Sequence, residues 1–284
     1  MFQPRDYQLR AIEATWKALV CDTTTLAVLP TGAGKTVVFS MLAEQWDGPV
    51  LVLAHRKELL NQAKDKLQRQ CREPVGIDQG QERAFPWGSR VLGCERIVCG
   101  SVPTLCKSSR RRVYDPAHPW LVIVDEAHHA TAKSYQVILK HFLGGNPKSR
   151  VVGVTATPKR TDGDGLIRVF ASAAFVYSIR EAINDGWLVD VETLRPTVTG
   201  LDFSSCKLRA GDLSADDVAA IATQERPLHE VAAVLRSEVG QRQGIVFCAN
   251  RRYVAAMTAV LQRDRYFGED RVGGADGATD PLIR

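Results

Sequence analysis

Short apolar runs alternate with segments of helical periodicity from the start of the chain to about residue 170. The runs are continuous and do not alternate with polar residues, which is typical of strands buried on both faces of a parallel sheet. Such strands are expected at Leu26–Leu29, Val50–Ala54, Ile97–Cys99, Leu121–Val124 and Val151–Val154. Helices are expected at Arg5–Leu19, Val37–Gln45 and Arg56–Arg69. The pattern predicts an α/β fold of three layers, with helices on both faces of a mostly parallel sheet.

The first expected helix has an apolar face made of Leu9, Ile12, Trp16 and Leu19. Residues spaced three and four apart lie on one side of a helix, so we expect this face to pack against the sheet.

The second part of the chain has a different pattern. Residues 194–243 are more polar and are punctuated by Pro and Gly, and two helices are expected there. A capping box at Ser214–Asp217 opens the first helix, and Pro227 lies near the start of the second. The apolar run Gly244–Cys248 predicts a further buried strand, followed by a helix at Tyr253–Leu261. Too few residues follow Gly244 to bury a core of their own, so the second α/β domain is expected to be incomplete. The expected divisions are 1–193, 194–243 and 244–284.

Composition narrows the class of protein. Of 284 residues, 45% are hydrophobic and 24% are charged, which is ordinary for a globular chain. The 37 Lys and Arg residues exceed the 32 Asp and Glu residues by five, which permits an anionic partner without requiring one. Seven cysteines without a CxxC pair favour reduced thiols. No secretory segment and no apolar run long enough to span a bilayer is visible, so a cytoplasmic protein without membrane association is expected.

The strongest chemical indication is Pro30-Thr-Gly-Ala-Gly-Lys-Thr36, between an expected strand and an expected helix. Glycines let backbone N–H groups turn toward phosphate oxygens, and the helix start adds the positive end of its dipole. In such loops the lysine bridges the β- and γ-phosphates and the hydroxyl binds Mg²⁺, roles that fall here to Lys35 and Thr36. The general pattern GxxxxGK[ST] is incomplete, because Leu29 occupies the position of its first glycine.

A second indication is Val124-Asp-Glu-Ala-His-His129, directly after an expected strand. Carboxylates at the C-terminal ends of parallel strands face the crevice where open α/β sheets bind ligands. We expect Asp125 to hold Mg²⁺ and Glu126 to orient and deprotonate the attacking water. An acidic pair after a strand is often a solvated turn, but the phosphate loop upstream favours the catalytic interpretation. His128 and His129 have no third ligand nearby and are not expected to bind a metal.

The order of these motifs resembles that of the DEAH-type superfamily 2 helicases. The matching segments are Pro30–Thr36, whose Pro-Thr-Gly start is the loop variant of nucleic-acid motors, Asp125–His128 and Thr155-Ala-Thr157-Pro158. Further segments resemble the adenine-reading motif (Arg5–Gln8), the strand-contacting motif (Ala54–Leu59) and the motif opening the second RecA-like domain (Gly244–Asn250). The run Gly153–Gly165 is most similar to DNA-translocating motor subunits of type I and type III restriction enzymes and related repair helicases.

The resemblance implies a RecA-like P-loop NTPase domain, followed by the start of a second RecA-like domain, with ATP and Mg²⁺ as cofactors. It implies that the nucleotide is bound by Arg5, Gln8, Thr31, Gly32, Ala33, Gly34, Lys35 and Thr36. Lys35, Asp125 and Glu126 would be catalytic, with Thr36 and Asp125 at the metal. His128 would relay the nucleotide state to Thr155 and Thr157. A nucleic-acid groove would be lined by His55, Arg56, Gly100 and Ser101, in contacts with backbone phosphates that do not depend on base sequence.

The implied function is that of an ATP-dependent DNA helicase or translocase, with DNA favoured over RNA and a nuclease or specificity subunit as partner. The Q-x-x-R-x-x-R segment that supplies arginine fingers in this family does not follow Gly244. Because such a finger contributes about 10³ to 10⁵ in rate, we expect the chain alone to bind ATP but to hydrolyse it slowly and not to unwind duplexes. The alternative is therefore an ATP- and DNA-binding module with little turnover.

Several assigned residues also have structural interpretations. Gln8 and Arg56 can be ordinary surface residues of helices, and Thr155 and Thr157 can simply end a strand. For Arg110–Arg112 a solvated loop is favoured over a DNA-binding patch, and for Trp187 a packing role is favoured over base stacking.

Overall fold

The computed structural model of the chain describes residues 3–55, 57–87, 93–157, 165–209, 212–263 and 265–275. Contacts within the chain divide it into two compact units, Met1–Asp190 and Val191–Arg284. None of the described helices is both long and apolar enough to cross a membrane. All seven cysteines are free thiols.

The first unit contains a seven-stranded sheet in which every pair of neighbouring strands is parallel. The strand order is β3-β4-β2-β5-β6-β1-β7. The bounds are β1 Thr24–Val28, β2 Val50–Ala54, β3 Val75–Asp78, β4 Ile97–Ser101, β5 Leu121–Asp125, β6 Arg150–Thr155 and β7 Ser172–Val176. The predicted α/β fold with a mostly parallel sheet is confirmed.

Burial on both faces explains why the strands are continuous apolar runs. In β2, Val50 and Val52 belong to one core cluster, whereas Leu51 and Leu53 belong to a second cluster on the opposite face. All four residues are completely buried. Successive side chains of a strand point to opposite faces, so a strand covered on both sides favours apolar residues at successive positions.

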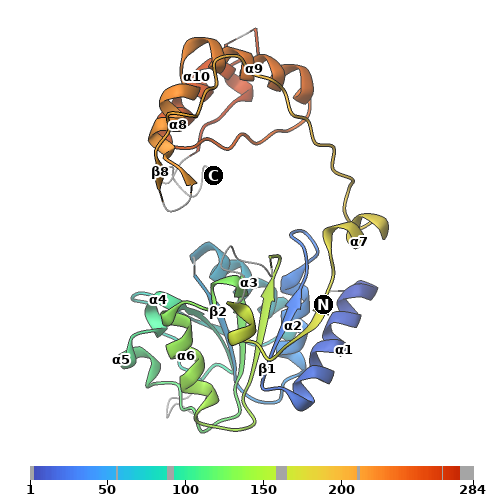
Figure 1. Ribbon diagram of the computed structural model, residues 1–284. Coiled ribbons are helices and arrows are strands. Elements are labelled where there is room, and N and C mark those ends of the chain that lie inside the picture. The colour runs from blue at the N-terminus through green and yellow to red at the C-terminus, as the bar shows by residue number, and fades with distance from the viewer. Residues whose placement is uncertain are drawn as a thin grey trace. The chain divides into compact units, whose positions relative to one another are not determined.

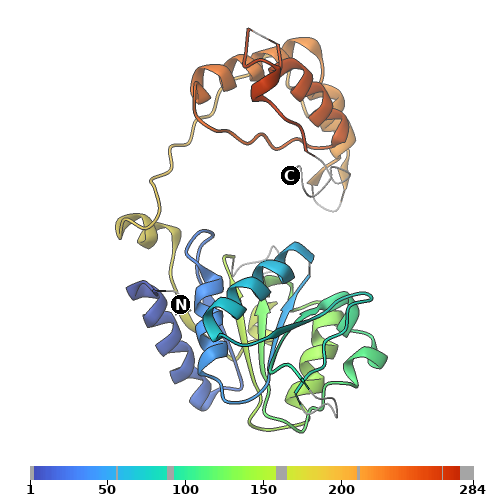
Figure 2. The same cartoon turned by 180° about the vertical axis from the view of Figure 1, so that it is seen from behind.

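Two helical layers cover the sheet (Figures 1 and 2). The helices α1 (Asp6–Cys21), α2 (Lys35–Gln45) and α3 (Lys57–Cys71) pack on one face, and α7 (Ile179–Asn184) contributes Ala182 to the same core. On the other face α6 (Lys133–Leu143) packs beside α4 (Val102–Leu105), which is followed by α5 (Ser108–Arg111). Short 3₁₀ helices lie at η1 (Ala127–His129) and η2 (Leu166–Arg168). Leu9 is 47% exposed, so its expected place on the buried face of α1 is wrong; Tyr7, Gln8 and Ala11 take that face instead.

The register of the strands brings the C-terminal ends of several strands together at one edge of the sheet. Val28 of β1 pairs with Thr155 of β6, and Ala54 of β2 pairs with Ser101 of β4. Asp125, the last residue of β5, pairs with Val154. The loops that follow these strands therefore leave the sheet side by side, which is where open parallel sheets bind ligands.

The second unit is mainly helical in its described residues. It contains α8 (Ala215–Ala222), α9 (Glu225–Val239), α10 (Arg251–Leu261), η3 (Glu269–Arg271) and the two-stranded hairpin β8 (Leu208–Arg209) and β9 (Asp212–Leu213). The three helices agree with expectation, but the capping box does not form. Ser214 is the N-cap residue of α8 without a side-chain cap bond, and the Asp217 carboxylate instead accepts a hydrogen bond from the Lys207 backbone N–H at 3.0 Å.

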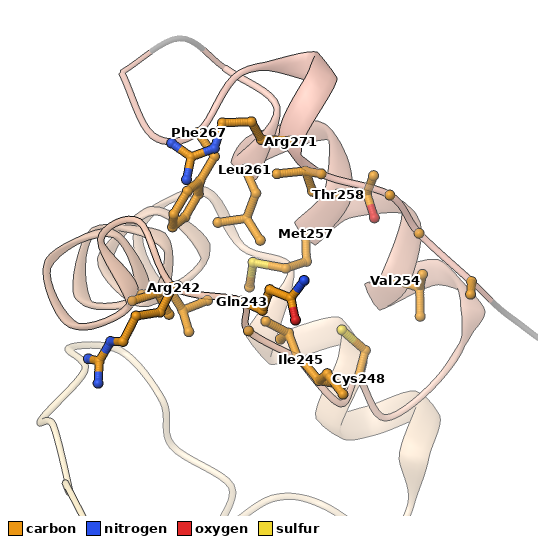
Figure 3. A pocket seen from close by; sticks show the side chains of 18 of the residues that line it. Arg242, Gln243, Ile245, Cys248, Val254, Met257, Thr258, Leu261, Phe267 and Arg271 are labelled. Atoms are coloured by element: carbon orange, nitrogen blue, oxygen red, sulfur yellow. The ribbon is translucent and has the colours of Figure 1, made fainter. Parts of the chain in front are cut away.

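The strand predicted at Gly244–Cys248 is wrong. This segment has no strand pairing, and Ile245 and Phe247 are 82% and 91% exposed. A parallel strand needs neighbouring strands for its backbone hydrogen bonds, and the described part of this unit offers only the β8–β9 hairpin. The segment borders a cavity of about 620 Å³, where Met257, Leu261 and Phe267 contribute apolar walls (Figure 3).

Candidate functional site

The phosphate loop lies between β1 and α2, as the sequence predicts. Gly32 and Gly34 have φ angles of 85° and 73°, in the left-handed region that a side chain strongly disfavours. Gly34 is the N-cap residue of α2, so Lys35 and Thr36 lie in the first helical turn. Backbone N–H groups in a first turn have no partner within the helix, which makes this turn suitable for binding phosphate oxygens.

Helix α1 holds the loop from one side through a shared acceptor. The Tyr7 hydroxyl and the Gln8 amide both donate hydrogen bonds to the Ala33 carbonyl, at 2.8 and 2.9 Å. The Gln8 side-chain oxygen accepts from the Arg5 backbone N–H at 2.9 Å. Gln8 is only 4% exposed, so its interpretation as an ordinary surface residue is excluded. A Cβ on Gly34 would lie 2.6 Å from the Gln8 amide nitrogen, so a side chain there would displace the Gln8 amide from its bond to Ala33.

The first carboxylate of the site, Asp125, ends β5 and is half-buried. Its Oδ1 atom accepts a hydrogen bond from the Glu126 backbone N–H at 3.0 Å. Burial raises the pKa of Asp125, and the neighbouring Glu126 carboxylate raises it further. The positive charge of Lys35 opposes this rise, so the phosphate loop and the carboxylate act on each other electrostatically. A bound divalent cation would favour the ionised form of Asp125 in the same way.

Glu126 has a strained backbone. Its φ and ψ angles of 50° and 53° are left-handed, although it carries a full side chain. Such residues are uncommon and concentrate at functional sites, where surrounding contacts maintain them. The turn redirects the chain at the end of β5 into η1 and sets the partly exposed Glu126 carboxylate 3.4 Å from Nδ1 of His128. A carboxylate of this kind is suited to orient a water molecule.

His128 connects this carboxylate with β6. Its Nδ1 atom also lies 3.2 Å from the Thr155 hydroxyl, which in turn accepts a hydrogen bond from the Thr157 backbone N–H at 3.2 Å. The Thr155 side chain is completely buried. The structure therefore brings together the three residues expected to relay the nucleotide state; the relay itself stays a prediction.

The donor set suits a magnesium ion. Thr36 offers a hydroxyl and Asp125 a carboxylate, and Mg²⁺ prefers such oxygen ligands together with substrate phosphates and water. No group of three or more His, Cys, Asp or Glu side chains that could hold a metal by themselves occurs in the part of the chain that the structure describes. These two residues would thus hold the ion only as part of a metal–nucleotide complex.

The residues expected at nucleic acid occupy different environments. His55, after β2, is exposed, and its ring centroid lies 6.2 Å from that of His129. Ser101 at the end of β4 is 3% exposed, and a Cβ on Gly100 would come within 2.4 Å of Leu105. Packing on Leu105 thus already accounts for a glycine at position 100. Arg56 lies outside the described residues.

The favoured interpretation of Arg110–Arg112 as a solvated loop is wrong for its first two residues. Both belong to α5, where Arg110 forms an ion pair with the buried Asp78 and Arg111 donates to the Leu105 carbonyl at 3.0 Å. Asp78 is buried because it lies in β3, and a buried carboxylate needs a partner of opposite charge, which Arg110 provides.

Aromatic residues around the site were not assigned from the sequence. Tyr7 lies beside Gln8 in the same motif, and its burial follows from the spacing of Tyr7 and Ala11 on α1. The Tyr135 hydroxyl on α6 is buried without a hydrogen-bond partner among the described residues. Burial raises the pKa of Tyr135 to about 12, and the charges of Asp125 and Glu126 contribute to the rise. The apolar spacing of α6 is consistent with the burial of Tyr135, but it does not predict the influence of Asp125 and Glu126 on its hydroxyl.

Comparison with known proteins identifies the family. Residues 1–160 match the model of the family described as type III restriction enzyme, res subunit. The chain belongs to this family. The match includes the phosphate loop, the Asp125–His128 segment and Thr155–Thr157.

Among curated proteins, the chain is 32% identical to the ATP-dependent helicase IRC3 of Saccharomyces cerevisiae over 73% of this chain and 31% of the relative. It is 31% identical to the mitochondrial ATP-dependent helicase irc3 of Schizosaccharomyces pombe over 87% of this chain and 41% of the relative. It is 28% identical to the endonuclease subunit of the type I restriction enzyme EcoAI of Escherichia coli over 68% of this chain and 24% of that subunit. The chain thus spans less than half the length of these relatives.

Among solved structures, the type ISP restriction-modification enzyme LlaGI, in complex with a DNA substrate mimic, has a similar fold. It matches with a TM-score of 0.51 and 14% identity, over 92% of this chain and 26% of that one. At this identity the likeness concerns the fold alone.

Proposed function

We propose that the chain is the motor portion of an ATP-dependent DNA helicase or translocase, in which ATP hydrolysis drives movement along nucleic acid. Membership of the restriction-enzyme family and the names of the helicase relatives support this function. The observation that carries it is the meeting of a phosphate loop and a carboxylate pair at one edge of the sheet. The loop follows β1, whose last residue Val28 pairs with Thr155 of β6, and Asp125 at the end of β5 pairs with Val154 of the same strand. The division into 1–193, 194–243 and 244–284 is part of the proposal.

The proposed site assigns each step to its own residues. Lys35 and the N–H groups of the first turn of α2 bind the triphosphate, while Thr36 and Asp125 bind Mg²⁺. The ion neutralises charge on the phosphates. Glu126 orients the attacking water and accepts its proton, and His128 passes the change in charge to Thr155 and Thr157. Arg5 and Gln8 bind the nucleobase in this proposal, which is supported by the hydrogen bond from the Gln8 amide to the Ala33 carbonyl of the loop.

DNA is the proposed polymer, bound through its phosphates by His55, Arg56 and the backbone at Gly100 and Ser101. Contacts of this kind depend strongly on salt and weakly on base sequence. A nuclease or specificity subunit is the proposed partner, in keeping with the type I restriction subunit among the relatives. The proposed location is the cytoplasm, although one relative is named as mitochondrial.

Release of inorganic phosphate from ATP, with and without single-stranded DNA, tests the proposal. We expect measurable release that requires Mg²⁺ and is abolished by Lys35→Ala and by Glu126→Gln. The two variants should differ in binding: Glu126→Gln should still bind ATP, because its carboxylate acts on water, whereas Lys35→Ala should not.

Lys140→Ala is the matched control, because Lys140 is an exposed lysine on α6 in the opposite helical layer. It should leave phosphate release unchanged. Turnover that survives Lys35→Ala would place hydrolysis outside this loop and contradict the proposal.

A further inference from the structure

An exposed tryptophan lies beside the phosphate loop. Trp187 follows α7, and its backbone N–H and that of Leu188 donate to the Ala182 carbonyl at 2.8 and 3.0 Å. These bonds fix the chain direction after the helix. The Trp187 side chain is nevertheless 42% exposed. The sequence alone favours packing for this residue, and packing does not require an exposed ring.

The exposed ring forms a platform with the motif at the start of α1. The Arg5 guanidinium lies over the Trp187 ring at 4.4 Å from its centroid, and the Tyr7 ring meets the same indole edge-on at 5.9 Å. Tyr7 stacks on Tyr177 at 4.5 Å, and the Tyr177 hydroxyl donates to Asp185 at 2.7 Å. The platform is thus anchored both to α1 and to the chain around α7.

The same segment touches the phosphate loop. The Leu188 side chain lies 3.3 Å from the position that a Cβ on Gly32 would occupy. Tyr7 meanwhile donates to the Ala33 carbonyl of the loop. Trp187 and Arg5 therefore lie close to the Gly32–Thr36 loop, because Leu188 lies beside Gly32 and Tyr7 is hydrogen-bonded to Ala33. A ligand bound there through its phosphates has its remaining part close to this platform.

A planar guanidinium stacked on an indole offers flat, polarisable surfaces that suit an aromatic base. Bases stack on aromatic and arginine side chains with little regard to their hydrogen-bonding edges. A triphosphate without a base has nothing to place against such surfaces. The platform therefore discriminates nucleoside triphosphates from bare polyphosphates.

We propose that Trp187 is a specificity-determining residue of the nucleotide site and forms, with Arg5, the platform on which the nucleobase stacks. This inference rests on the proposed function, because it assumes a triphosphate on the Gly32–Thr36 loop. It adds the segment after α7 to the site and links base recognition to the residues that directly precede the boundary between the two units at Asp190 and Val191.

Binding of ATP and of inorganic tripolyphosphate, each with Mg²⁺, is measured by titration calorimetry on the full chain. For Trp187→Leu we expect ATP affinity to fall about tenfold while tripolyphosphate affinity is unchanged. Trp187→Phe keeps an aromatic surface and should retain most of the ATP affinity. The matched control is Trp87→Leu, since Trp87 is 41% exposed and is placed elsewhere in the same unit. It should change neither affinity.

Either of two results in Trp187→Leu overturns the inference: unchanged ATP affinity, or an equal loss for both ligands, which would mean that the loop itself had been disturbed. If the wild-type chain binds tripolyphosphate but gains no affinity from the base, the platform has no function and only the inference fails. If the wild-type chain binds neither ligand, the proposed function fails and the inference falls with it. Should Trp187→Leu not fold, Trp187→Met gives the same comparison without an aromatic ring at this position, and equal losses for both ligands there again contradict the inference.

Discussion

Two hydrogen bonds join α1 to the phosphate loop, and their contribution to stability can be tested by removing the two donors, Tyr7 and Gln8, separately and together. Tyr7→Phe removes the hydroxyl bonded to the Ala33 carbonyl but keeps the ring stacked on Tyr177. Gln8→Met removes the second donor to the same carbonyl with little change of volume. Because the two donors share one acceptor, each single variant leaves that acceptor with a partner.

The expected losses in the free energy of unfolding follow from the fact that both donors bind the Ala33 carbonyl. A single hydrogen bond contributes about 0.5–1.5 kcal/mol net, and the lower end applies while the carbonyl keeps its other donor. Ala33 is only 1% exposed, so the double variant leaves a buried carbonyl without a partner. An unsatisfied buried group costs about 1–3 kcal/mol. We therefore expect the double variant to lose about 1 kcal/mol more than the sum of the two single losses, as a non-zero coupling energy.

Urea unfolding followed by tryptophan fluorescence is the assay. The five tryptophans are Trp16, Trp46, Trp87, Trp120 and Trp187, and all belong to the first unit, so the signal reports on that unit alone. Thr15→Val is the control, because the Thr15 hydroxyl is buried on the same helix but donates only to Ala11 within α1. Its loss should add to that of Tyr7→Phe without coupling. Strictly additive losses for Tyr7→Phe and Gln8→Met would refute the shared acceptor.

Two further predictions concern the core of the first unit. Burial raises the pKa of Cys99 to about 12, so its thiol stays protonated at pH 8 and iodoacetamide should modify the exposed Cys21 while sparing Cys99; comparable labelling of both peptides by mass spectrometry would contradict the buried position. A Cβ on Gly153 would lie 2.4 Å from Cζ of Phe170, so Gly153→Ala should lower the free energy of unfolding by about 1–3 kcal/mol, and Phe170→Leu in the same chain should restore part of it. A Gly153→Ala variant as stable as the wild type would show that the Phe170 ring moves aside freely.

The sequence predicts the central strands well because their burial on both faces favours long runs of apolar residues. The two strands that it did not predict lie at the edges of the sheet. In β3 (Val75–Asp78) a glycine and an aspartate interrupt the apolar run. β7 (Ser172–Val176) has an apolar run that begins with two alanines, but the strand is only half-buried, so its residues lack the burial that marks the central strands. Gly244–Cys248 shows the opposite error. It has the apolar run but no neighbouring strands in the described part of its unit, and a strand requires partners as well as composition.

The candidate site, too, has parts that the sequence predicts and parts that it does not. Local motifs identify the loop at Gly32–Thr36 and the carboxylates at Asp125 and Glu126, because their chemistry depends on short spacings. The contacts of Gln8 with Ala33 and of Trp187 with Arg5 join segments far apart in the chain. Only the fold brings such segments together, and no spacing within the sequence encodes them.

The central claim is that the phosphate loop and the Asp125 carboxylate share one metal-bound triphosphate. Calorimetric titration of ATP at increasing Mg²⁺ concentration, on the wild-type chain, Lys35→Ala and Asp125→Asn, tests it most directly. We expect Mg²⁺ to strengthen ATP binding to the wild type, Lys35→Ala to lose most of the affinity, and Asp125→Asn to lose the strengthening by Mg²⁺. An Asp125→Asn variant that binds ATP with the wild-type dependence on Mg²⁺ would contradict the claim.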